Sequence, residues 1–273
     1  MIISETKRLL RTFRIVPNRL LGQNFMVDTS IFPKLSDYAS LCKADVVLDA
    51  GAGFGFLTRF LANKCKVVLA VEKDPHVAAV LREQLKGLVA NVTVIEGDVL
   101  KAAVPSFSKV VSIPPYQISS RLLLWLFDRS FDCAVLVLQK EFAGRLVAAV
   151  GSEDYGWLTV ATCYSAEVQL LDAVPNFMFY PQPEVYSAIV RLTPWKASPF
   201  KVKDGAFFRR MVRWLFTQRN KKLSNALAPF IKSTFKVTKE DAEKASSTFS
   251  FREKRVRELP PEAFGEIANA LVR

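Results

Sequence analysis

Short apolar runs alternate with amphipathic stretches through the first half of the chain. Five runs rich in Val, Ile and Leu predict strands at 46–51, 67–74, 92–98, 109–113 and 133–139. Apolar residues at helical spacing between them predict helices at 54–64, 76–87 and 118–128. Strands that are apolar throughout and separated by helices indicate an α/β fold whose parallel sheet is covered on both faces.

The pattern changes in the second half of the chain. Residues 157–174 and 184–194 alternate in part, and they predict two longer strands that add an antiparallel edge to the same sheet. From about residue 200 the spacing of apolar residues is helical again. We therefore predict a Rossmann-like domain with a mostly parallel seven-stranded sheet in residues 1–199, and a small all-helical domain in residues 200–273.

The positive charge of the chain is concentrated at its two ends. The net charge is +12 over 273 residues, of which residues 1–24 carry +4 and residues 201–273 carry +9. The middle, residues 25–200, is almost neutral at −1. This distribution favours a catalytic or ligand-binding middle flanked by surfaces that bind a polyanion. A solvated basic surface that serves solubility is the alternative.

Several classes of protein are disfavoured by what the sequence lacks. No apolar run is long enough for a transmembrane helix, and the first residues lack the features of a secretory signal. Four widely spaced cysteines and one histidine form no CxxC motif and no metal-ligand spacing. We expect a cytoplasmic protein with free thiols, no metal and no membrane partner.

Glycines follow the first predicted strand in the stretch DAGAGFGFLT, residues 49–58. Gly51 and Gly53 allow a ligand to approach the backbone, and their GxGxG spacing differs from the GxGxxG of pyrophosphate-binding loops. Glu72 ends the second strand and suits a ribose diol, whereas Asp98 ends the third and suits an adenine amino group. Because parallel strands end at one edge of a sheet, this set favours S-adenosylmethionine over a dinucleotide.

Seven segments extend along nearly the whole chain and are similar to those of a known family: LGQNFMVD, DAGAGFGFLT, VEKDP, IEGDVL, PPYQISS, FYPQPEVYSAIVRLTP and FTQRNKKLSNAL. In these segments the chain resembles the KsgA-type ribosomal RNA adenine dimethyltransferases, and the archaeal ones in particular. The resemblance implies an S-adenosylmethionine-dependent methyltransferase domain and a small helical RNA-binding domain. It implies transfer of methyl groups to N6 of two adjacent adenosines near the 3′ end of small-subunit ribosomal RNA, in a pre-ribosomal small subunit.

The resemblance also assigns residues to roles. The implied cofactor contacts are Asn24, Met26, Gly51, Gly53, Glu72, Asp98 and Ile113. The basic block 216–227 reads by itself as an amphipathic helix, and its candidate RNA contacts are Arg219, Lys221 and Lys222. We expect the protein to act as a monomer.

The loop after the fourth strand departs from the family's pattern. The family motif reads Asn, an apolar residue, Pro, Tyr, and Ile113 occupies the Asn position here. Tyr116 can still stack on a target base, and the carbonyls of Ile113 and Pro114 can still accept hydrogen bonds from its amine. Losing one preorganised polar contact typically costs about 10²–10³ in rate. A bulge that swings Ser112 into the site is one conceivable replacement.

Two other functions are consistent with parts of this pattern. A ribosome-assembly or other nucleic-acid-binding factor that retains the cofactor pocket but does little chemistry would explain Ile113. A nicotinamide-dependent oxidoreductase rests on fold analogy alone, and the chain lacks the GxGxxG that it would need.

Overall fold

The computed structural model describes residues 2–18 and 21–272, and its chain forms two compact units. The first unit contains residues 1–143 and 169–194, and the second contains residues 144–168 and 195–273. The predicted boundary at residue 200 differs from this division, because residues 144–168 belong to the unit of the C-terminal helices. Among the described residues, no helix has the length and apolar composition needed to cross a bilayer.

A seven-stranded sheet forms the centre of the first unit, with the strand order β4-β3-β2-β5-β6-β9-β7. Pairings from β4 through β6 are parallel, whereas β9 runs antiparallel to β6. The predicted mixed sheet is therefore confirmed. Its strands are β2 (Val46–Ala50), β3 (Val67–Glu72), β4 (Val92–Glu96), β5 (Lys109–Ser112), β6 (Cys133–Gln139), β7 (Ala166–Val174) and β9 (Ser187–Pro194).

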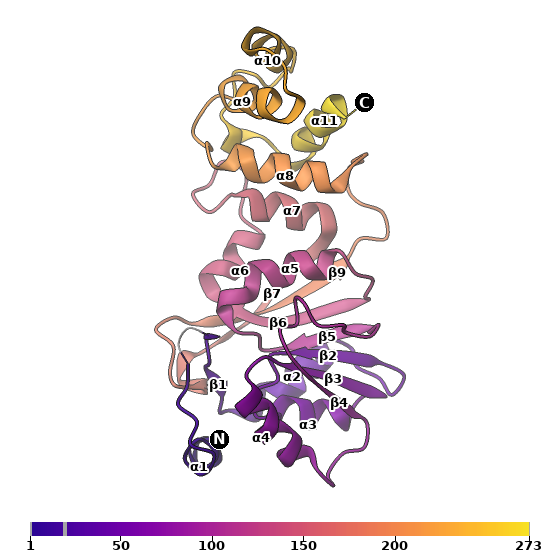
Figure 1. Ribbon diagram of the computed structural model, residues 1–273, viewed down its shortest axis with the longest axis vertical. Coiled ribbons are helices and arrows are strands. Elements are labelled where there is room, and N and C mark those ends of the chain that lie inside the picture. The colour runs from indigo at the N-terminus through magenta and orange to yellow at the C-terminus, as the bar shows by residue number, and fades with distance from the viewer. Residues whose placement is uncertain (1, 19–20, 273) are drawn as a thin grey trace. The chain divides into compact units, whose positions relative to one another are not determined.

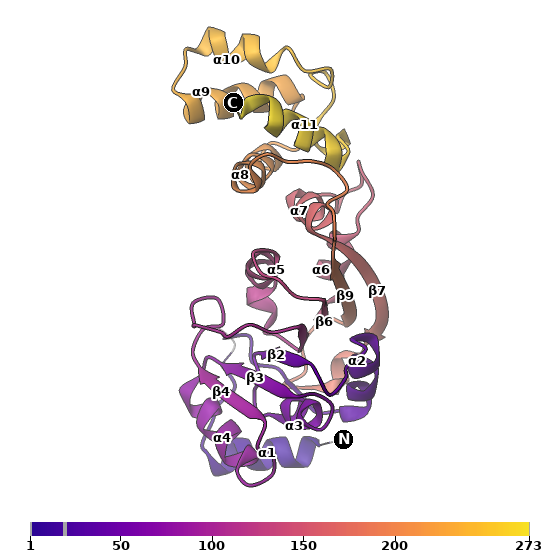
Figure 2. The same cartoon turned by 90° about the vertical axis from the view of Figure 1, so that its right-hand side faces the viewer.

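Helices cover this sheet on both faces, as the continuous apolar strands predicted. Helices α3 (Phe56–Ala62) and α4 (Pro75–Leu85) pack on β2, β3 and β4, and α5 (Ser119–Phe127) lies on the opposite side (Figures 1 and 2). Right-handed crossovers produce this arrangement because the strand order reverses between β2 and β5. The loops after β2 and β5 therefore meet at the carboxyl edge of the sheet, where α/β proteins bind ligands.

The N-terminal segment is attached to the first unit by a second, two-stranded sheet. Strand β1 (Phe25–Met26) pairs antiparallel with β8 (Phe179–Tyr180), which brings residues far apart in sequence together. Asp28 caps the following turn by accepting a hydrogen bond from the Ser30 amide at 3.0 Å. The remaining elements of this part are α1 (Ile3–Thr12), η2 (Thr29–Ile31), α2 (Phe32–Tyr38), η3 (Tyr116–Ile118), α6 (Lys140–Leu146) and η4 (Asn176–Met178).

The second unit is helical and has its own apolar core. Helix α8 (Gly205–Phe216) contributes Phe207, Phe208, Met211 and Leu215, which recur at helical spacing and are buried. Asp204 begins this helix by accepting a hydrogen bond from the Phe207 amide at 2.9 Å. The other elements are α7 (Trp157–Ser165), α9 (Leu223–Phe235), α10 (Lys239–Ser246), η5 (Val256–Glu258) and α11 (Pro261–Leu271).

Two secondary-structure predictions were wrong. Residues 157–165 form helix α7 rather than the first half of a strand, and only residues 166–174 are extended. The run is apolar enough to fit both the spacing of a helix and the alternation of a strand. Packing of α7 against α8 and α11 selects the helix. Residues 217–222 form the turn between α8 and α9, so the block 216–227 is not one helix.

Candidate active site

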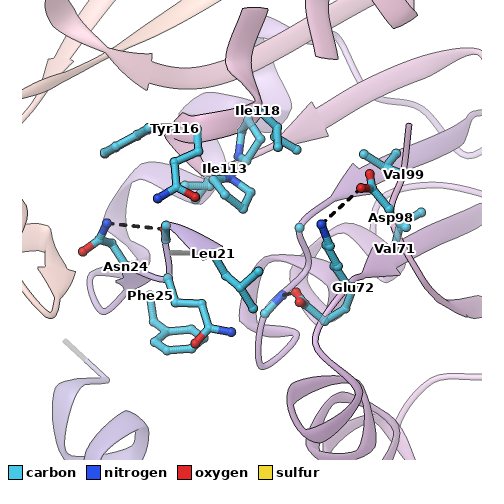
Figure 3. A pocket seen from close by; sticks show the side chains of 18 of the residues that line it. Leu21, Asn24, Phe25, Val71, Glu72, Asp98, Val99, Ile113, Tyr116 and Ile118 are labelled. Carbon is cyan, nitrogen blue, oxygen red and sulfur yellow. Dashed lines mark hydrogen bonds and ion pairs between the residues drawn. The ribbon is translucent and has the colours of Figure 1, made fainter. Parts of the chain in front are cut away.

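A pocket lies at the carboxyl edge of the sheet, where the loops after β2, β3, β4 and β5 meet. Among the predicted cofactor contacts, it is lined by Asn24, Gly51, Gly53, Glu72, Asp98 and Ile113. Pro114 and Tyr116 from the loop after β5 also line it. In Figure 3, Tyr116 and Ile113 lie on one side of the pocket and Glu72 and Asp98 on the other. Apart from Met26, the predicted cofactor and target-base residues therefore share one cavity.

The glycine loop touches the loop after β5 directly. Gly51 has φ +82°, and a Cβ built there would lie 2.6 Å from Pro115 Cδ and 3.6 Å from Pro114 Cα. Gly53 also has positive φ, and its amide donates a hydrogen bond of 2.9 Å to Glu72 Oε2. Glycine is required at position 51 both for its backbone conformation and because there is no space for a side chain.

Two carboxylates of different electrostatic character lie at the strand ends. Glu72 is 9 % exposed, and burial raises its pKa even though the Gly53 and Asp74 amides donate to its oxygens at 2.9 Å each. Burial by itself would raise the pKa of Asp98 too. Hydrogen bonds from the Leu100 amide and from Lys73 outweigh that effect, so the pKa of Asp98 is lowered. Both groups offer oxygen atoms to ligand hydroxyl or amino groups.

The Tyr116 ring is held in a fixed orientation. Its hydroxyl shares a hydrogen bond of 2.5 Å with the buried Ser187 Oγ. Its ring also meets Phe179 edge to face, with the centroids 6.3 Å apart and the planes at 68°. Ser187 begins β9 of the seven-stranded sheet and Phe179 lies in β8 of the two-stranded sheet, so residues that follow β7 in the chain position the aromatic group of the β5 loop. Such an oriented ring at a pocket wall can stack on a base.

Ser112 does not replace the missing side-chain acceptor. It is fully buried, its hydroxyl accepts from the Ala50 amide at 2.8 Å and it donates to the Leu48 carbonyl at 3.2 Å. The side chain therefore links β5 to β2 and does not line the pocket. A bulge that turns Ser112 inward is wrong, because β5 remains regular through this residue.

Met26 is the one predicted cofactor residue outside this pocket. It is 7 % exposed and lines a smaller adjoining cavity with Asp49 and Phe56. Asn24 borders both cavities, and its side-chain amide donates a hydrogen bond of 3.4 Å to the Gly22 carbonyl.

Several pocket residues were not predicted from the sequence. Phe179, Lys73 and Arg121 line the pocket together with Gln23 and Gln117. Phe179 begins the family-like segment FYPQPEVYSAIVRLTP, to which we assigned no site residue, and no periodicity marks it as one. Its pairing with β1 is what brings it to the pocket.

The three candidate RNA contacts lie on the turn between α8 and α9. Arg219 donates hydrogen bonds to the carbonyls of Glu153 and Ser152 at 2.7 and 2.9 Å, which connects two loops of the second unit. Lys222 forms an ion pair of 2.6 Å with Glu253. Lys221 is exposed and lines a groove between α9 and α10 that also holds Lys232 and Lys239. Within this set, Lys221 has the ammonium best placed for a phosphate.

A buried acid beside the site gives a prediction for pH dependence. Asp49 is 1 % exposed and accepts a hydrogen bond of 2.7 Å from Thr58, and burial raises its pKa to about 7. Because the folded-state pKa exceeds the ordinary value of 3.8, the folded protein binds more protons than the unfolded one between these values. The contribution of Asp49 to the free energy of unfolding should fall as pH rises from about 4 to about 7, by up to about 1.4 kcal/mol per unit.

Urea denaturation across this pH range checks the sign. In Asp49→Asn the fall in the free energy of unfolding with pH should be shallower than in the wild type. The exposed Glu240→Gln serves as a control that changes one charge without removing a buried carboxyl group. An equal slope in Asp49→Asn and the wild type would contradict the assignment.

The strand order reverses between β2 and β5, and the pocket lies at the carboxyl ends of these strands. This combination defines the class of Rossmann-like methyltransferases. The family model described as ribosomal RNA adenine dimethylase matches residues 17–271, and the chain belongs to this family. It is 39 % identical over 277 residues to the "Probable ribosomal RNA small subunit methyltransferase A" of Methanosarcina barkeri, covering 98 % of this chain and 92 % of that one.

Solved structures support the same class. A dimethyladenosine transferase from Plasmodium falciparum has 27 % sequence identity and a TM-score of 0.74, over 88 % of this chain and 94 % of that one. The 23S rRNA methyltransferase ErmE has 29 % identity and a TM-score of 0.64, over 92 % and 100 % of the two chains. Both cover the two units described above.

Proposed function

We propose that the protein transfers methyl groups from S-adenosylmethionine to N6 of two adjacent adenosines near the 3′ end of small-subunit ribosomal RNA. The observation that carries the proposal is the single pocket that joins the glycine loop, Glu72 and Asp98 to the loop holding Tyr116. A methyl donor and a base can be bound on its opposite sides. Membership of the adenine dimethylase family supports the same reaction.

The cofactor end of the pocket has the donor and acceptor pattern that S-adenosylmethionine requires. Gly51 and Gly53 line this end of the pocket with backbone alone. The buried Glu72 carboxylate suits a ribose diol, and Asp98, whose pKa is lowered, suits the adenine amino group. When bound, the cofactor supplies an electrophilic methyl group on a sulfonium.

The loop after β5 binds and orients the target adenine in this proposal. The base is flipped out of the RNA and its face stacks on the Tyr116 ring, which Ser187 and Phe179 orient. Among the described residues, no hydrogen bond ends on the carbonyls of Ile113 or Pro114, so the loop keeps a backbone acceptor for one N–H of the N6 amine. Such an acceptor directs the nitrogen lone pair toward the methyl group, and correct positioning then supplies much of the rate.

Basic surfaces of both units bind RNA phosphates. In the first unit, helix α1 buries Leu9 and Leu10 and exposes Lys7, Arg8 and Arg11. In the second unit, Lys221 borders the lysine-rich groove between α9 and α10. Contacts of this kind position the RNA without reading its sequence, and their strength falls steeply with salt.

The salt dependence of RNA binding distinguishes the two adjacent lysines. Lys221→Gln should reduce the slope of log K against log salt by about 1, which is the effect expected of one phosphate contact. Lys222→Gln should change the slope less, because Glu253 already neutralises that ammonium group. Titrating small-subunit RNA at several salt concentrations measures both slopes. Equal slopes for the wild type and Lys221→Gln would remove Lys221 from the RNA surface.

Methyl transfer from labelled S-adenosylmethionine to undermethylated small subunits tests the proposed function. Nucleosides are separated afterwards, so that N6-methyl- and N6,N6-dimethyladenosine are counted, and we expect the dimethyl product. A second candidate, an assembly factor with little chemistry, is favoured by the apolar side chain of Ile113 in the pocket. Tight binding to the subunit without any methyladenosine would favour that factor.

A further inference from the structure

Ile113 presents an apolar side chain to the pocket, in the loop where the proposed function places the substrate amine. Ile113 lines the pocket with Tyr116 and is half-buried against the apolar core of the first unit. The hydroxyl of the preceding residue, Ser112, is engaged by the backbone of β2. The acceptors that this loop offers to N6 are therefore backbone carbonyls.

The other amide side chains of the pocket make contacts of their own. Asn24 donates a hydrogen bond of 3.4 Å to the Gly22 carbonyl. Gln23 donates to Asp74 Oδ2 at 2.8 Å and accepts from the Asn18 amide at 2.8 Å. The Gln117 side chain packs against Gly22, where an added Cβ would lie 3.3 Å from its Cδ and Oε1. That contact directs the Gln117 amide toward the 21–24 segment.

We infer that Ile113 makes the second methyl transfer faster relative to the first, so that monomethyladenosine does not accumulate. This inference rests on the proposed function. A primary amine has two N–H groups, and binding one of them against Ile113 leaves a buried donor without an acceptor. N6-methyladenosine has only one N–H, and its methyl group packs on Ile113 while the N–H reaches a backbone carbonyl.

Each transfer has the same chemical balance. The N6 lone pair forms the new C–N bond as the methyl C–S bond breaks, and the electron pair of that bond goes to sulfur. The methylated nitrogen then loses one proton to water, and S-adenosylhomocysteine leaves. The two transfers differ in the substituents that N6 presents to Ile113, which is why this residue can change their relative rates.

Time courses on undermethylated small subunits measure the two rate constants from the mono- and dimethyl products. Ile113→Asn supplies an acceptor and should lower the ratio of the second rate constant to the first by about tenfold, the effect of satisfying one buried donor. Monomethyladenosine should then accumulate transiently. A variant that is only misfolded would lower both rates without this change in ratio.

A second pair of variants controls for shape. Ile113→Val and Ile113→Thr have side chains of nearly the same shape, and only Thr carries a hydroxyl. Ile113→Val should keep the high ratio of the second methylation rate constant to the first, even where both rate constants fall. Ile113→Thr should lower this ratio. Gln117→Leu should keep the ratio as well, and a higher ratio would show that Gln117 accepts a hydrogen bond from N6 and would overturn the inference.

The outcomes separate this inference from the proposed function. Methyladenosine with the same ratio in the wild type, Ile113→Asn and Ile113→Thr would overturn the inference and leave the proposed function intact. No methyladenosine from the wild type or any variant would overturn the proposed function, and the inference with it.

Discussion

Replacing Tyr116 by alanine should lower the rate of methyl transfer by about 10²-fold and change the affinity for S-adenosylmethionine little. Base–aromatic stacking contributes about 1–3 kcal/mol per base, and a base that is misplaced by about 1 Å loses about 10² in rate. The ring lies across the pocket from Glu72 and Asp98, which serve the cofactor in our proposal (Figure 3). Single-turnover methylation and calorimetric titration of the cofactor measure the two effects separately.

Two variants isolate the role of the Tyr116 hydroxyl. Tyr116→Phe keeps the ring and removes the hydrogen bond to Ser187, and Ser187→Ala removes the same bond from the other side. Each should lower the rate by about fivefold, as expected from one hydrogen bond worth about 1 kcal/mol, and the double variant should be no worse than either single one. Wild-type rates in Tyr116→Ala would contradict a stacking role.

Replacing Gly51 by alanine should also lower methyl transfer by about 10²-fold, and it should weaken cofactor binding as well. An alanine at φ +82° is strained, by about 1–3 kcal/mol. Its Cβ would lie 2.6 Å from Pro115 Cδ, and the proline ring is rigid, so one of the two loops must move. That displacement separates the methyl donor from the target base. Rates, cofactor titration and thermal unfolding together measure the effect.

Gly151 provides a matched control for this variant. Its φ is +83°, and nothing lies within 4 Å of a Cβ built on it. Gly151→Ala should therefore carry the same backbone strain as Gly51→Ala without displacing a neighbour, so it should lower the unfolding temperature but retain cofactor binding. Equal cofactor affinity and equal rates in the two variants would contradict the steric argument.

The order of strands and helices in the first half of the chain could be predicted because periodicity reports burial directly. Strands such as Val67–Glu72 and Cys133–Gln139 are buried on both faces, and their continuous apolar runs have few other interpretations. The positions of Gly51, Glu72 and Asp98 in one pocket followed from the rule that parallel strands end at one edge. The spacing of apolar residues was sufficient to predict a strand or a helix wherever a segment fits only one of the two periodicities.

Predictions failed where a segment has no dominant pattern of its own. Residues 157–165 fit a strand as well as a helix, and packing against α8 and α11 decided between them. Phe179 and Ser187 entered the site through strand pairings of long sequence separation. Arg219 has the charge of an RNA contact, but its guanidinium group binds two carbonyls of the second unit.

The sequence by itself determined the α/β class, the family resemblance, the glycine loop and the presence of an apolar residue, Ile113, in the loop after the fourth strand, because each is a property of adjacent residues. Only the tertiary structure decided that Ser112 cannot replace that Asn, because its hydroxyl binds β2. The same holds for the orientation of Tyr116, which Ser187 of β9 and Phe179 of β8 fix. Such contacts join residues up to 71 positions apart, and the pattern along a chain does not specify which distant groups will meet.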